Sequence, residues 1–382
     1  MSNLGIYIHI PFCISKCSYC DFASVPLNDA IEKYVDSLIK EIDLNSPLLE
    51  EYMIDTIFIG GGTPSAIKPE YIGRVLASIR SKFSVAESAE ITIEVNPGTV
   101  DDQKAALYRS YGINRISMGI QSFDDSLLRK LGRIHTGKDA KATVCVLREH
   151  GFTNINGDFI FGLPGQTLES FLSDLQEASE LMLSHISIYG LIIEEGTPMK
   201  KWVEEGSVYL PDEDIERNMY HQGIELLSKA GYHQYEISNL SLEGKECKHN
   251  IGYWKLKPYL GLGLSAHSNI GPKRYWNTSS FEEYFNSIEN GEVPIKGEEN
   301  LDIETRASEF VILGLRMNEG IAYSEILEMF GVDLKERYGT VINNHKKSGL
   351  INDSKTHLQL TEKGMDLSNR VEIEFLPEDK KY

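Results

Sequence analysis

The segment Cys13-Ile-Ser-Lys-Cys17-Ser-Tyr-Cys20 gathers three cysteines within eight residues. The chain of 382 residues has five cysteines in all, so this trio needs a joint explanation. A cubane [4Fe-4S] cluster normally takes four Cys thiolates, and three thiolates leave one iron open. An open iron suits direct binding of a small molecule, much as a catalytic zinc site keeps one position free. The segment therefore predicts a [4Fe-4S] cluster on Cys13, Cys17 and Cys20.

A zinc site or a set of disulfides would account for these cysteines less well. A structural zinc ion would need a fourth ligand, for which His9 or Asp21 is near enough in sequence. Disulfides do not fit, because the cysteine count is odd and the spacing is not that of a secreted scaffold. The sequence starts without the features of a signal peptide, and no apolar run reaches the length of a membrane span. We expect a cytoplasmic protein in a reducing compartment.

Composition and charge restrict the class of partner. Hydrophobic residues make up 41% of the chain, which is enough for a sizeable core divided over two or three modules. The net charge of -19 opposes binding to nucleic acid, because that affinity rests on Lys and Arg neutralising phosphates. DNA and RNA are therefore not expected as substrates or partners.

Strand-like and helix-like patterns alternate over the first half of the chain. Short apolar runs predict six strands, at residues 6–10, 56–59, 91–95, 115–119, 155–160 and 186–189. Helical spacing falls between them, at residues 30–44, 70–82, 101–111, 138–150 and 168–183. Such an alternation predicts an α/β fold of parallel βαβ units, which right-handed crossovers curl into a barrel or partial barrel. The active site of that fold lies at the carboxyl ends of the strands.

Unusual polar and glycine residues occur where these predicted strands end. The second strand ends in Gly60-Gly-Gly-Thr-Pro64, and the third carries Glu94. The fourth ends near Gln121, and the fifth holds Asp158. A run of glycines lets the backbone approach a ligand closely. Each residue alone would more often be structural, but their placement on successive strand ends predicts one shared site.

Several ordered motifs resemble one known family. They are Ile6-Tyr-Ile-His-Ile-Pro-Phe-Cys13, the cysteine trio, Gly60–Pro64, Glu94–Gly98, Ser117–Phe123, Leu131–His135, Asp158–Gly165 and Gly261-Leu-Gly-Leu-Ser265. The trio with Tyr19 before its last cysteine is similar to the radical S-adenosylmethionine (radical SAM) signature. The whole set resembles the radical SAM family of oxygen-independent coproporphyrinogen III dehydrogenases (HemN) and their relatives. The resemblance implies a (β/α)6 partial TIM barrel, a SAM-ligated cluster and a role related to porphyrins.

The resemblance also implies which residues surround SAM. Carried over by motif, these residues are Tyr7, Tyr19, Gly61, Gly62, Thr63, Glu94, Gln121, Arg133 and Asp158, with backbone near Gly190 and around Ala266 or His267 completing the pocket. The chemistry of three of them fits. Carboxylates such as Glu94 can accept from ribose hydroxyls or the methionine ammonium, and Arg133 can fork onto the methionine carboxylate. Tyr19 offers a flat face for adenine.

Two departures from the dehydrogenase pattern point to another branch of the family. The dehydrogenase motif has a fourth cysteine where this chain has Phe22, and the dehydrogenase carries a long segment before its cysteines, whereas Cys13 lies near the start of this sequence. Residues 249–254 read His-Asn-Ile-Gly-Tyr-Trp, which resembles the His-Asn-x-x-Tyr-Trp motif of HemW, the haem chaperone branch. HemW is also similar in having Phe at this position and an early cysteine motif.

The His249–Trp254 segment is a candidate haem contact. Imidazole is a standard axial ligand of haem iron, and Tyr253 and Trp254 could stack on a macrocycle. Cys247 and His267 are rival ligands. The residues by themselves also fit a plainer interpretation, in which His249 makes local hydrogen bonds and both aromatic residues belong to the core.

The pattern changes after about residue 295. Residues 305–317, 324–330 and 334–349 predict helices, 350–361 a hairpin and 366–375 a last helix. Three helices with a β-wing are typical of a winged helix, here a C-terminal winged-helix-like α+β domain with a covering or interaction role. We expect three parts: a radical SAM partial barrel at 1–200, a barrel extension with the His249–Trp254 segment at 201–295, and the C-terminal domain at 296–382.

The resemblance favours a haem chaperone that carries a [4Fe-4S] cluster and SAM. Its expected partners are haem and acceptor haemoproteins, membrane-associated acceptors included, and its expected location is the cytoplasm or the membrane periphery. Two enzymatic functions are alternatives: oxygen-independent coproporphyrinogen III oxidation, or another radical SAM reaction on a tetrapyrrole. The oxidase activity itself is not expected, because Phe22 departs from the dehydrogenase motif.

Overall fold

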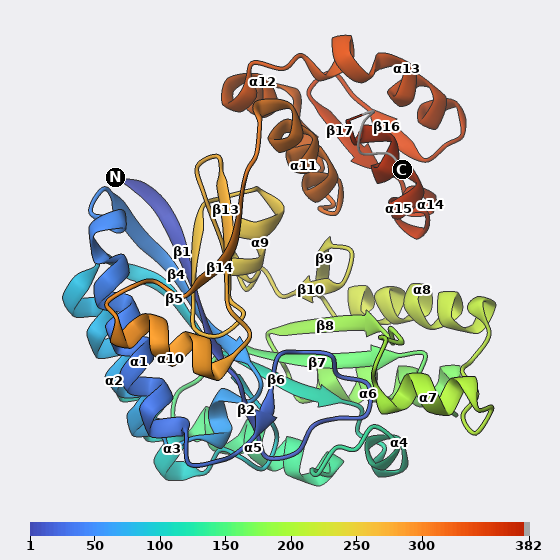
Figure 1. The fold of residues 1–382 in the computed structure, drawn as a ribbon. Helices are drawn as coiled ribbons and strands as arrows, with labels where there is room; N and C mark the ends of the chain where they lie inside the picture. Colours follow the sequence, from blue (N-terminus) through green and yellow to red (C-terminus); the bar gives the residue numbers. More distant parts are fainter. Residues whose placement is uncertain (378–382) are drawn as a thin grey trace.

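A mixed sheet of twelve strands organises the structure, a computed structural model in which residues 1–377 are described. Figure 1 shows the sheet curving through the lower part of the molecule, with helices along its outer side. The strand order is β14-β13-β12-β11-β1-β4-β5-β6-β7-β8-β10-β9. The six predicted strands lie together at its centre, so the predicted α/β partial barrel is confirmed.

The central strands pair in parallel, each with its neighbour in sequence. They are β1 (Ser2–Ile10), β4 (Tyr52–Gly61), β5 (Val85–Val95), β6 (Arg115–Gln121), β7 (Ile155–Phe161) and β8 (His185–Gly190). The first three begin several residues before their predicted starts, where the pattern is less apolar. A short parallel pair, β2 (Phe12–Cys13) and β3 (Val25–Pro26), holds the two ends of the cysteine loop together.

Helices cover the outer face of the strands at the predicted places. They are α1 (Ile31–Asn45), α2 (Pro69–Lys82), α3 (Asp102–Ser110), α5 (Gly137–Glu149) and α6 (Leu168–Glu180), with the short α4 (Asp125–Lys130) between β6 and α5. Side chains fix several helix starts: Asp101 caps α3, and Thr136 and Thr167 form capping boxes on α5 and α6. Such caps satisfy backbone N–H groups that have no partner inside the helix.

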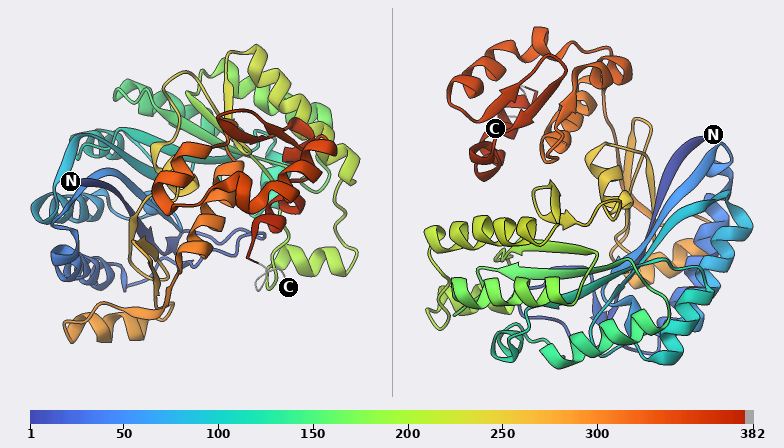
Figure 2. Two further views of the ribbon diagram at one scale, coloured as in Figure 1. Left: turned by 90° about the horizontal axis from the view of Figure 1, so that it is seen from above. Right: turned by 180° about the vertical axis from the view of Figure 1, so that it is seen from behind.

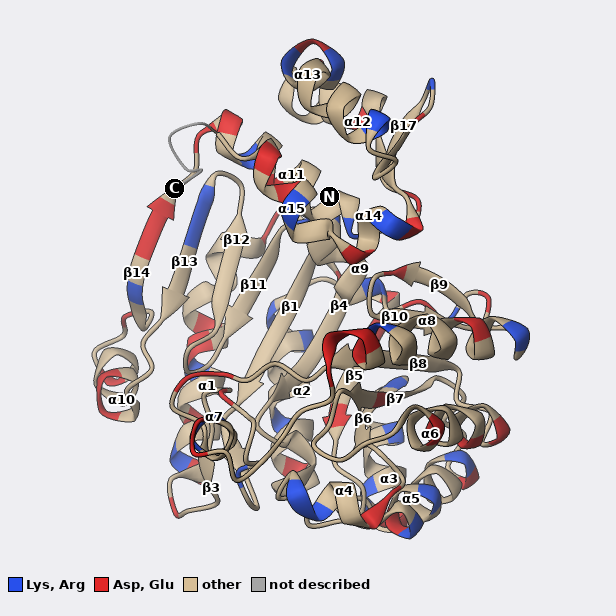
Figure 3. Cartoon of the chain, turned by 90° about the vertical axis from the view of Figure 1, so that its right-hand side faces the viewer, with Lys and Arg blue, Asp and Glu red and all other residues tan. Residues whose placement is uncertain are grey.

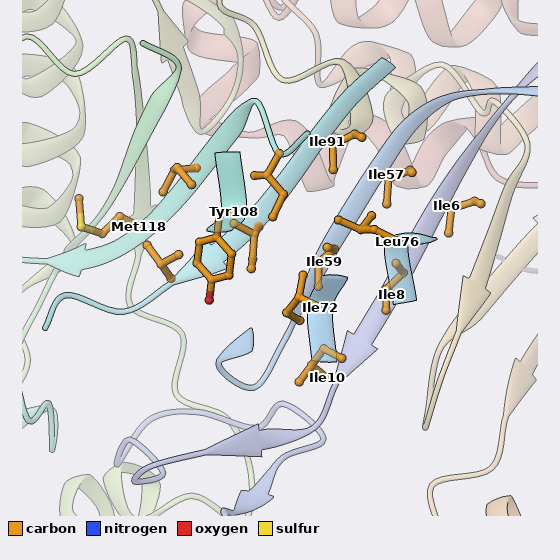
Figure 4. Close-up of a cluster of buried hydrophobic side chains, with 14 of the residues drawn as sticks. Ile6, Ile8, Ile10, Ile57, Ile59, Ile72, Leu76, Ile91, Tyr108 and Met118 are labelled. Carbon is orange, nitrogen blue, oxygen red and sulfur yellow. The ribbon is translucent and has the colours of Figure 1, made fainter. Parts of the chain in front are cut away.

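The main core lies between these helices and the sheet. Ile6, Ile8 and Ile10 of β1 are fully buried, and Figure 4 shows their neighbours from β4, β5, β6, α2 and α3. β-branched residues pack well on a pleated surface and are stiff. The apolar packing therefore holds the carboxyl ends of the parallel strands in register.

The segment after β8 extends the sheet at both ends. Its elements are α7 (Pro198–Glu204), α8 (Glu213–Lys229), β9 (His233–Glu236), β10 (Asn239–Ser241), α9 (Lys248–Trp254), β11 (Tyr259–Leu262), β12 (His267–Ile270), β13 (Lys273–Asn277), α10 (Phe281–Glu289) and β14 (Ile295–Asn300). β11 pairs with β1 as a seventh parallel strand, and β12–β14 continue antiparallel. The sheet thus runs on past the predicted boundary between residues 295 and 296.

Ion pairs join the last two strands of this extension. Figure 3 shows basic and acidic residues side by side on β13 and β14. Lys273 Nζ lies 2.6 Å from Glu298 Oε2, and Arg274 Nη1 lies 3.1 Å from Glu299 Oε1. Opposite charges on neighbouring strands support their pairing.

The C-terminal elements pack around a core of their own. They are α11 (Ile303–Leu315), β15 (Ile321–Ala322), α12 (Tyr323–Phe330), α13 (Leu334–Lys347), β16 (Ile351–Asp353), β17 (His357–Leu360), α14 (Glu362–Asp366), α15 (Ser368–Glu372) and the 3-10 turn η3 (Ile373–Phe375). The predicted three helices and hairpin are present. The single predicted helix at 366–375 is wrong: Leu367, at φ -117° and ψ 26°, separates α14 from α15.

The C-terminal domain sits over one end of the sheet. Figure 1 shows it above α9 and β9, and the right-hand view of Figure 2 shows the same arrangement from behind. Ile237 N donates to Arg316 O at 3.1 Å and Asn318 N to Tyr235 O at 3.0 Å, so backbone hydrogen bonds connect the domain to β9. None of the helices in the described range is both long enough and apolar enough to cross a membrane.

Candidate functional site

A cavity of about 140 Å³ lies at the carboxyl ends of the parallel strands. It is lined by residues from the cysteine loop and from the ends of β4, β5, β6 and β7. Eleven predicted site residues meet there: Cys13, Cys17, Tyr19, Cys20, Gly61, Gly62, Thr63, Glu94, Gln121, Arg133 and Asp158. Residues spread over more than a hundred positions are thus gathered at one edge of the sheet, where parallel folds place their active sites.

Hydrogen bonds reach two of the three cysteines in this cavity. All three are free thiols, with Cys13 buried and Cys17 and Cys20 half-buried. Thr63 Oγ1 donates to Cys13 Sγ at 3.6 Å, and Arg133 Nη1 donates to Cys17 Sγ at 3.4 Å. Burial raises the pKa of the Cys20 thiol. A hydroxyl donor and a guanidinium thus stand beside two of the sulfur atoms, which would bind metal as thiolates.

The cysteine loop supplies the type of donor that an iron–sulfur cluster uses. No three His, Cys, Asp or Glu side chains within residues 1–377 converge on a site for one metal ion. An iron–sulfur cluster instead takes several separate thiolates. The loop has the three thiolates that the sequence predicts, and Phe22 lies beside them on the cavity wall.

The glycine turn after β4 is required by close packing. Gly61 has φ +112°, and a Cβ on it would lie 2.6 Å from the His9 ring. A Cβ on Gly62 would lie 2.7 Å from the backbone oxygen of Phe12. Only glycine fits without a shift, so the turn brings bare backbone against the cysteine loop.

Two half-buried carboxyl groups line the cavity. Glu94 Oε2 accepts from Gly61 N at 3.1 Å, and Asp158 Oδ1 accepts from Asn156 Nδ2 at 2.8 Å. Burial, with Asp158 nearby, raises the pKa of Glu94 to about 8. Burial also raises the pKa of Asp158. Both groups are poised to bind hydroxyl or ammonium donors of a ligand, which would supply the partners that favour the charged form.

Arg133 places a half-buried guanidinium in the cavity. Its Nη2 donates to Asn96 Oδ1 at 2.8 Å and to Gly119 O at 2.5 Å, while Nη1 reaches Cys17. Nearby Tyr19 and Cys17 raise the pKa of the guanidinium against the opposing effect of burial. Gln121 adopts φ 67°, an uncommon conformation for a residue other than glycine, and such outliers cluster at functional sites.

Three predicted SAM contacts lie in adjoining cavities. Tyr7 and His267 line one of about 320 Å³, which shares Phe22, Gly61 and Glu94 with the first. Gly190 lines another of about 510 Å³, which shares Tyr19, Gln121 and Asp158 with it. The cavities are therefore neighbours, and these three residues line the two that adjoin the first.

Several lining residues had no predicted role. Asn96 Nδ2 donates to Thr63 Oγ1 at 3.0 Å and fixes the turn beside Cys13. Ser117 Oγ accepts from Asn156 Nδ2 at 2.8 Å. Arg115 is buried below them, and Asp158 is among the groups whose charge raises its pKa. Asn96 and Ser117 belong to the motifs Glu94–Gly98 and Ser117–Phe123, and these motifs could have identified them from the sequence. Arg115 lies at the start of a strand and belongs to no such motif.

His249 is buried and uses both ring nitrogens. It is 3% exposed. Nδ1 lies 2.8 Å from Thr56 Oγ1, and Nε2 lies 2.9 Å from Tyr253 Oη. The ring also stacks on Phe58, with centroids 5.3 Å apart. Burial lowers the pKa of His249 to about 3. The imidazole is thus neutral and hydrogen-bonded, as the plainer interpretation of the motif expects.

The remaining residues of this segment differ in access. Tyr253 and Trp254 are half-buried and line a further cavity beside α9. Cys247 is fully buried, its pKa is raised to about 12 by burial, and its Sγ donates to Glu90 Oε1 at 3.7 Å. Cys247 therefore offers no exposed thiolate to a ligand.

Two family models match the chain, one over the barrel and one over the C-terminal domain. The model of the radical SAM superfamily matches residues 7–178, and that of the HemN C-terminal domain matches residues 301–367. Coproporphyrinogen III oxidase (HemN) from Escherichia coli has a similar solved structure, with a TM-score of 0.85, 24% identity and coverage of 98% of this chain and 90% of that one. At this identity the likeness shows the fold alone.

The named relatives show to which family within the superfamily the chain belongs. Heme chaperone HemW from Lactococcus lactis is 36% identical over 98% of this chain and 97% of its own. Heme chaperone HemW from Bacillus subtilis is 34% identical over 97% and 99%, and that from Escherichia coli is 41% identical over 70% of each chain. The superfamily name implies SAM and an iron–sulfur cluster. Identity at this level over nearly the whole length means that the chain belongs to the HemW family of the radical SAM superfamily.

Proposed function

We propose that this protein is a haem chaperone, which binds haem and delivers it to acceptor haemoproteins while carrying a SAM-ligated [4Fe-4S] cluster. One observation carries the proposal: relatives named heme chaperone match 97–98% of the chain at 34–36% identity. The acceptors are haemoproteins of the cytoplasm or the membrane surface.

Cys13, Cys17 and Cys20 are the proposed cluster ligands. They share one loop, and donors from Thr63 and Arg133 reach two of the sulfur atoms. When bound, the cluster supplies an open iron at which SAM can be held and reduced. Arg133 places its positive charge next to Cys17, where it offsets the negative charge of a thiolate.

The proposed SAM contacts follow from the same cavity. Glu94 and Asp158 accept hydrogen bonds from the ribose or the ammonium group, and Arg133 and Gln121 face the methionine end. Gly61, Gly62 and Thr63 offer backbone against the ligand, and the Tyr19 ring lies against adenine. Tyr7, Gly190 and His267 stand in the adjoining cavities, as outer contacts.

Tyr253 and Trp254 are proposed haem contacts. Both line an open cavity, and aromatic rings suit a flat macrocycle. Ligation by His249 would require its hydrogen bonds to Thr56 or Tyr253 to break. His249 is therefore more easily understood as the residue that orients Tyr253.

Coproporphyrinogen III oxidation is the competing function, which the sequence motifs shared with the HemN dehydrogenases suggest. We expect no meaningful oxidation, because Phe22 lines the cluster cavity at the position where the dehydrogenase motif has a cysteine. The experiment incubates anaerobically reconstituted protein with coproporphyrinogen III, SAM and a reductant, and titrates a second sample with haem.

Saturable haem binding with no stoichiometric protoporphyrinogen is the expected result. A transfer assay with an apo-haemoprotein then checks delivery. Stoichiometric product would instead support the oxidase, and a parent protein that binds no haem would end the chaperone proposal.

A further inference from the structure

A second open cavity, the α9 cleft, lies between the barrel extension and the C-terminal domain. Its volume is about 560 Å³, within the range of pockets that hold small molecules and cofactors. Four aromatic side chains form its walls: Tyr253, Trp254, Tyr259 and Trp276. Leu313 of α11 contributes from the C-terminal domain. The lining thus offers several aromatic faces to a flat ligand.

His267 lines this cleft with both ring nitrogens available. Of the ten histidines, nine have a hydrogen bond or ion pair to another described residue. His267 has none among residues 1–377, and its ring is exposed. It stacks on Trp276, with ring centroids 5.8 Å apart and an angle of 24°.

Two cations stand at the same cleft. Lys257 is exposed, and no ion pair joins it to another residue in the described range. Arg274 pairs with Glu299 and Glu309, at 3.1 and 2.7 Å. Glu299 lines the cleft as well. The carboxylates of a ligand would therefore meet Lys257 directly and would compete with both glutamates for Arg274. Haem is such a ligand, with a flat apolar ring and two propionates.

Two buried polar atoms of the lining also have no partner. Nε1 of Trp254 and Oδ1 of Asn269 make no hydrogen bond in the part of the chain that the structure describes. Such orphan atoms are uncommon in folded proteins and need a specific cause. Their presence on one cleft sets this cavity apart from an ordinary surface hollow.

The α9 cleft adjoins the cluster cavity. A cavity of about 320 Å³ shares Tyr253, Tyr259 and His267 with the cleft. The same cavity shares Phe22, Gly61 and Glu94 with the cluster site. A ligand on His267 would therefore lie next to the cluster cavity, and it would take the place of the outer SAM contact proposed for His267.

We propose that the α9 cleft binds haem, with a ring nitrogen of His267 as axial ligand, the aromatic side chains against the macrocycle, and Lys257 and Arg274 toward the propionates. The assignment rests on the proposed haem binding and names its site. It moves the axial ligand from His249, whose nitrogens are occupied, to His267, whose nitrogens are free.

The test is a haem titration of the cluster-reconstituted protein, followed through the Soret and visible bands. His267→Gly should lower affinity about tenfold or more and shift the bands, and added imidazole should restore them by filling the space of the missing ring. His233→Ala, at an exposed histidine paired with Glu246 on β9, is the matched control and should behave like the parent. Lys257→Glu should weaken binding with unchanged bands.

The possible results of this titration distinguish a wrong haem site from a wrong function. If the parent binds haem and His267→Gly keeps its affinity and spectrum, the cleft assignment is overturned and the chaperone proposal stands. If His249→Ala, and not His267→Gly, changes the bands, His249 is the ligand. If the parent binds no haem, the function itself fails. Iron content and circular dichroism at parent levels establish that each variant is folded.

Discussion

Cys17 and Arg133 make one of the contacts that link the cysteine loop to the barrel. Arg133 Nη1 lies 3.4 Å from Cys17 Sγ, and its Nη2 holds Asn96 and Gly119 at the ends of β5 and β6. A guanidinium stays charged and is stabilised by ionised partners. A thiolate at Cys17 provides such a partner, so the loop and the strand ends support each other electrostatically.

Replacing Cys17 by Ala should abolish cluster binding. The loop offers three thiolates, and the loss of one leaves a second iron without a protein ligand. Iron and sulfide content after anaerobic reconstitution, with the absorbance of the cluster, is the measurement. Cys145→Ala, at an exposed position on α5, is the control and should keep parent iron content. Parent-level iron in Cys17→Ala would refute the ligand assignment.

The turn between β11 and β12 shows how two strands place a functional side chain. Gly261 of β11 lies so close to β12 that a Cβ on it would stand 2.0 Å from His267 O. Gly263 has φ +96° and Ser265 has φ 58°, which lets the chain reverse within a few residues. Close backbone contact therefore sets where His267 begins β12.

Gly261→Ala should destabilise the protein by about 1–3 kcal/mol, because the methyl group collides with backbone that cannot move alone. It should also weaken haem binding if the α9 cleft is the site. Gly252→Ala in α9 is the matched control: its Cβ would meet nothing closer than 3.9 Å, and alanine favours a helix. Urea denaturation and haem titration measure both effects. Equal stability of the two variants would contradict the steric argument.

Glu41 joins segments that lie far apart in sequence. Its Oε2 accepts from Gly263 N at 2.8 Å and from Tyr284 Oη at 2.6 Å, and its Oε1 accepts from Asn277 Nδ2 at 2.6 Å. One carboxyl group of α1 thus holds the β11–β12 turn, β13 and α10. Burial raises the pKa of Glu41 to about 7, against the opposing effect of these donors.

This pKa predicts a specific dependence of stability on pH. Between about pH 4.5 and 7 the folded protein keeps a proton on Glu41 that the unfolded chain has released. The free energy of unfolding should therefore fall as pH rises through this window, by up to about 1.4 kcal/mol per pH unit. Glu41→Gln should remove this contribution, as measured by urea denaturation at several pH values.

Glu282→Gln provides the comparison for that series, because Glu282 is exposed on α10. Its unfolding free energy should follow the pH dependence of the parent. A parent and Glu41→Gln variant with parallel pH profiles would show that Glu41 is ionised throughout the window.

The sequence by itself determined the features that depend on local pattern. Six apolar runs predicted the parallel strands, because strands buried on both faces must be apolar along their length. The cysteine spacing and the Gly60–Pro64 turn predicted where the cavity lies, since the carboxyl ends of parallel strands meet at one edge. The resemblance to HemW, confirmed by curated relatives, rested on motifs in their order along the chain.

Only the tertiary structure decided the features that depend on distant contacts. The pairing of β11 with β1 joins residues about 250 positions apart, and no local pattern encodes it. The sequence presents His249 as the haem candidate of the His-Asn-x-x-Tyr-Trp motif and His267 as a SAM-pocket residue and rival haem ligand. Folding buries His249 between Thr56 and Tyr253 and leaves His267 unpartnered in an aromatic cleft of the described chain. Whether a side chain is free to bind depends on which groups satisfy its polar atoms, and those groups come from distant elements.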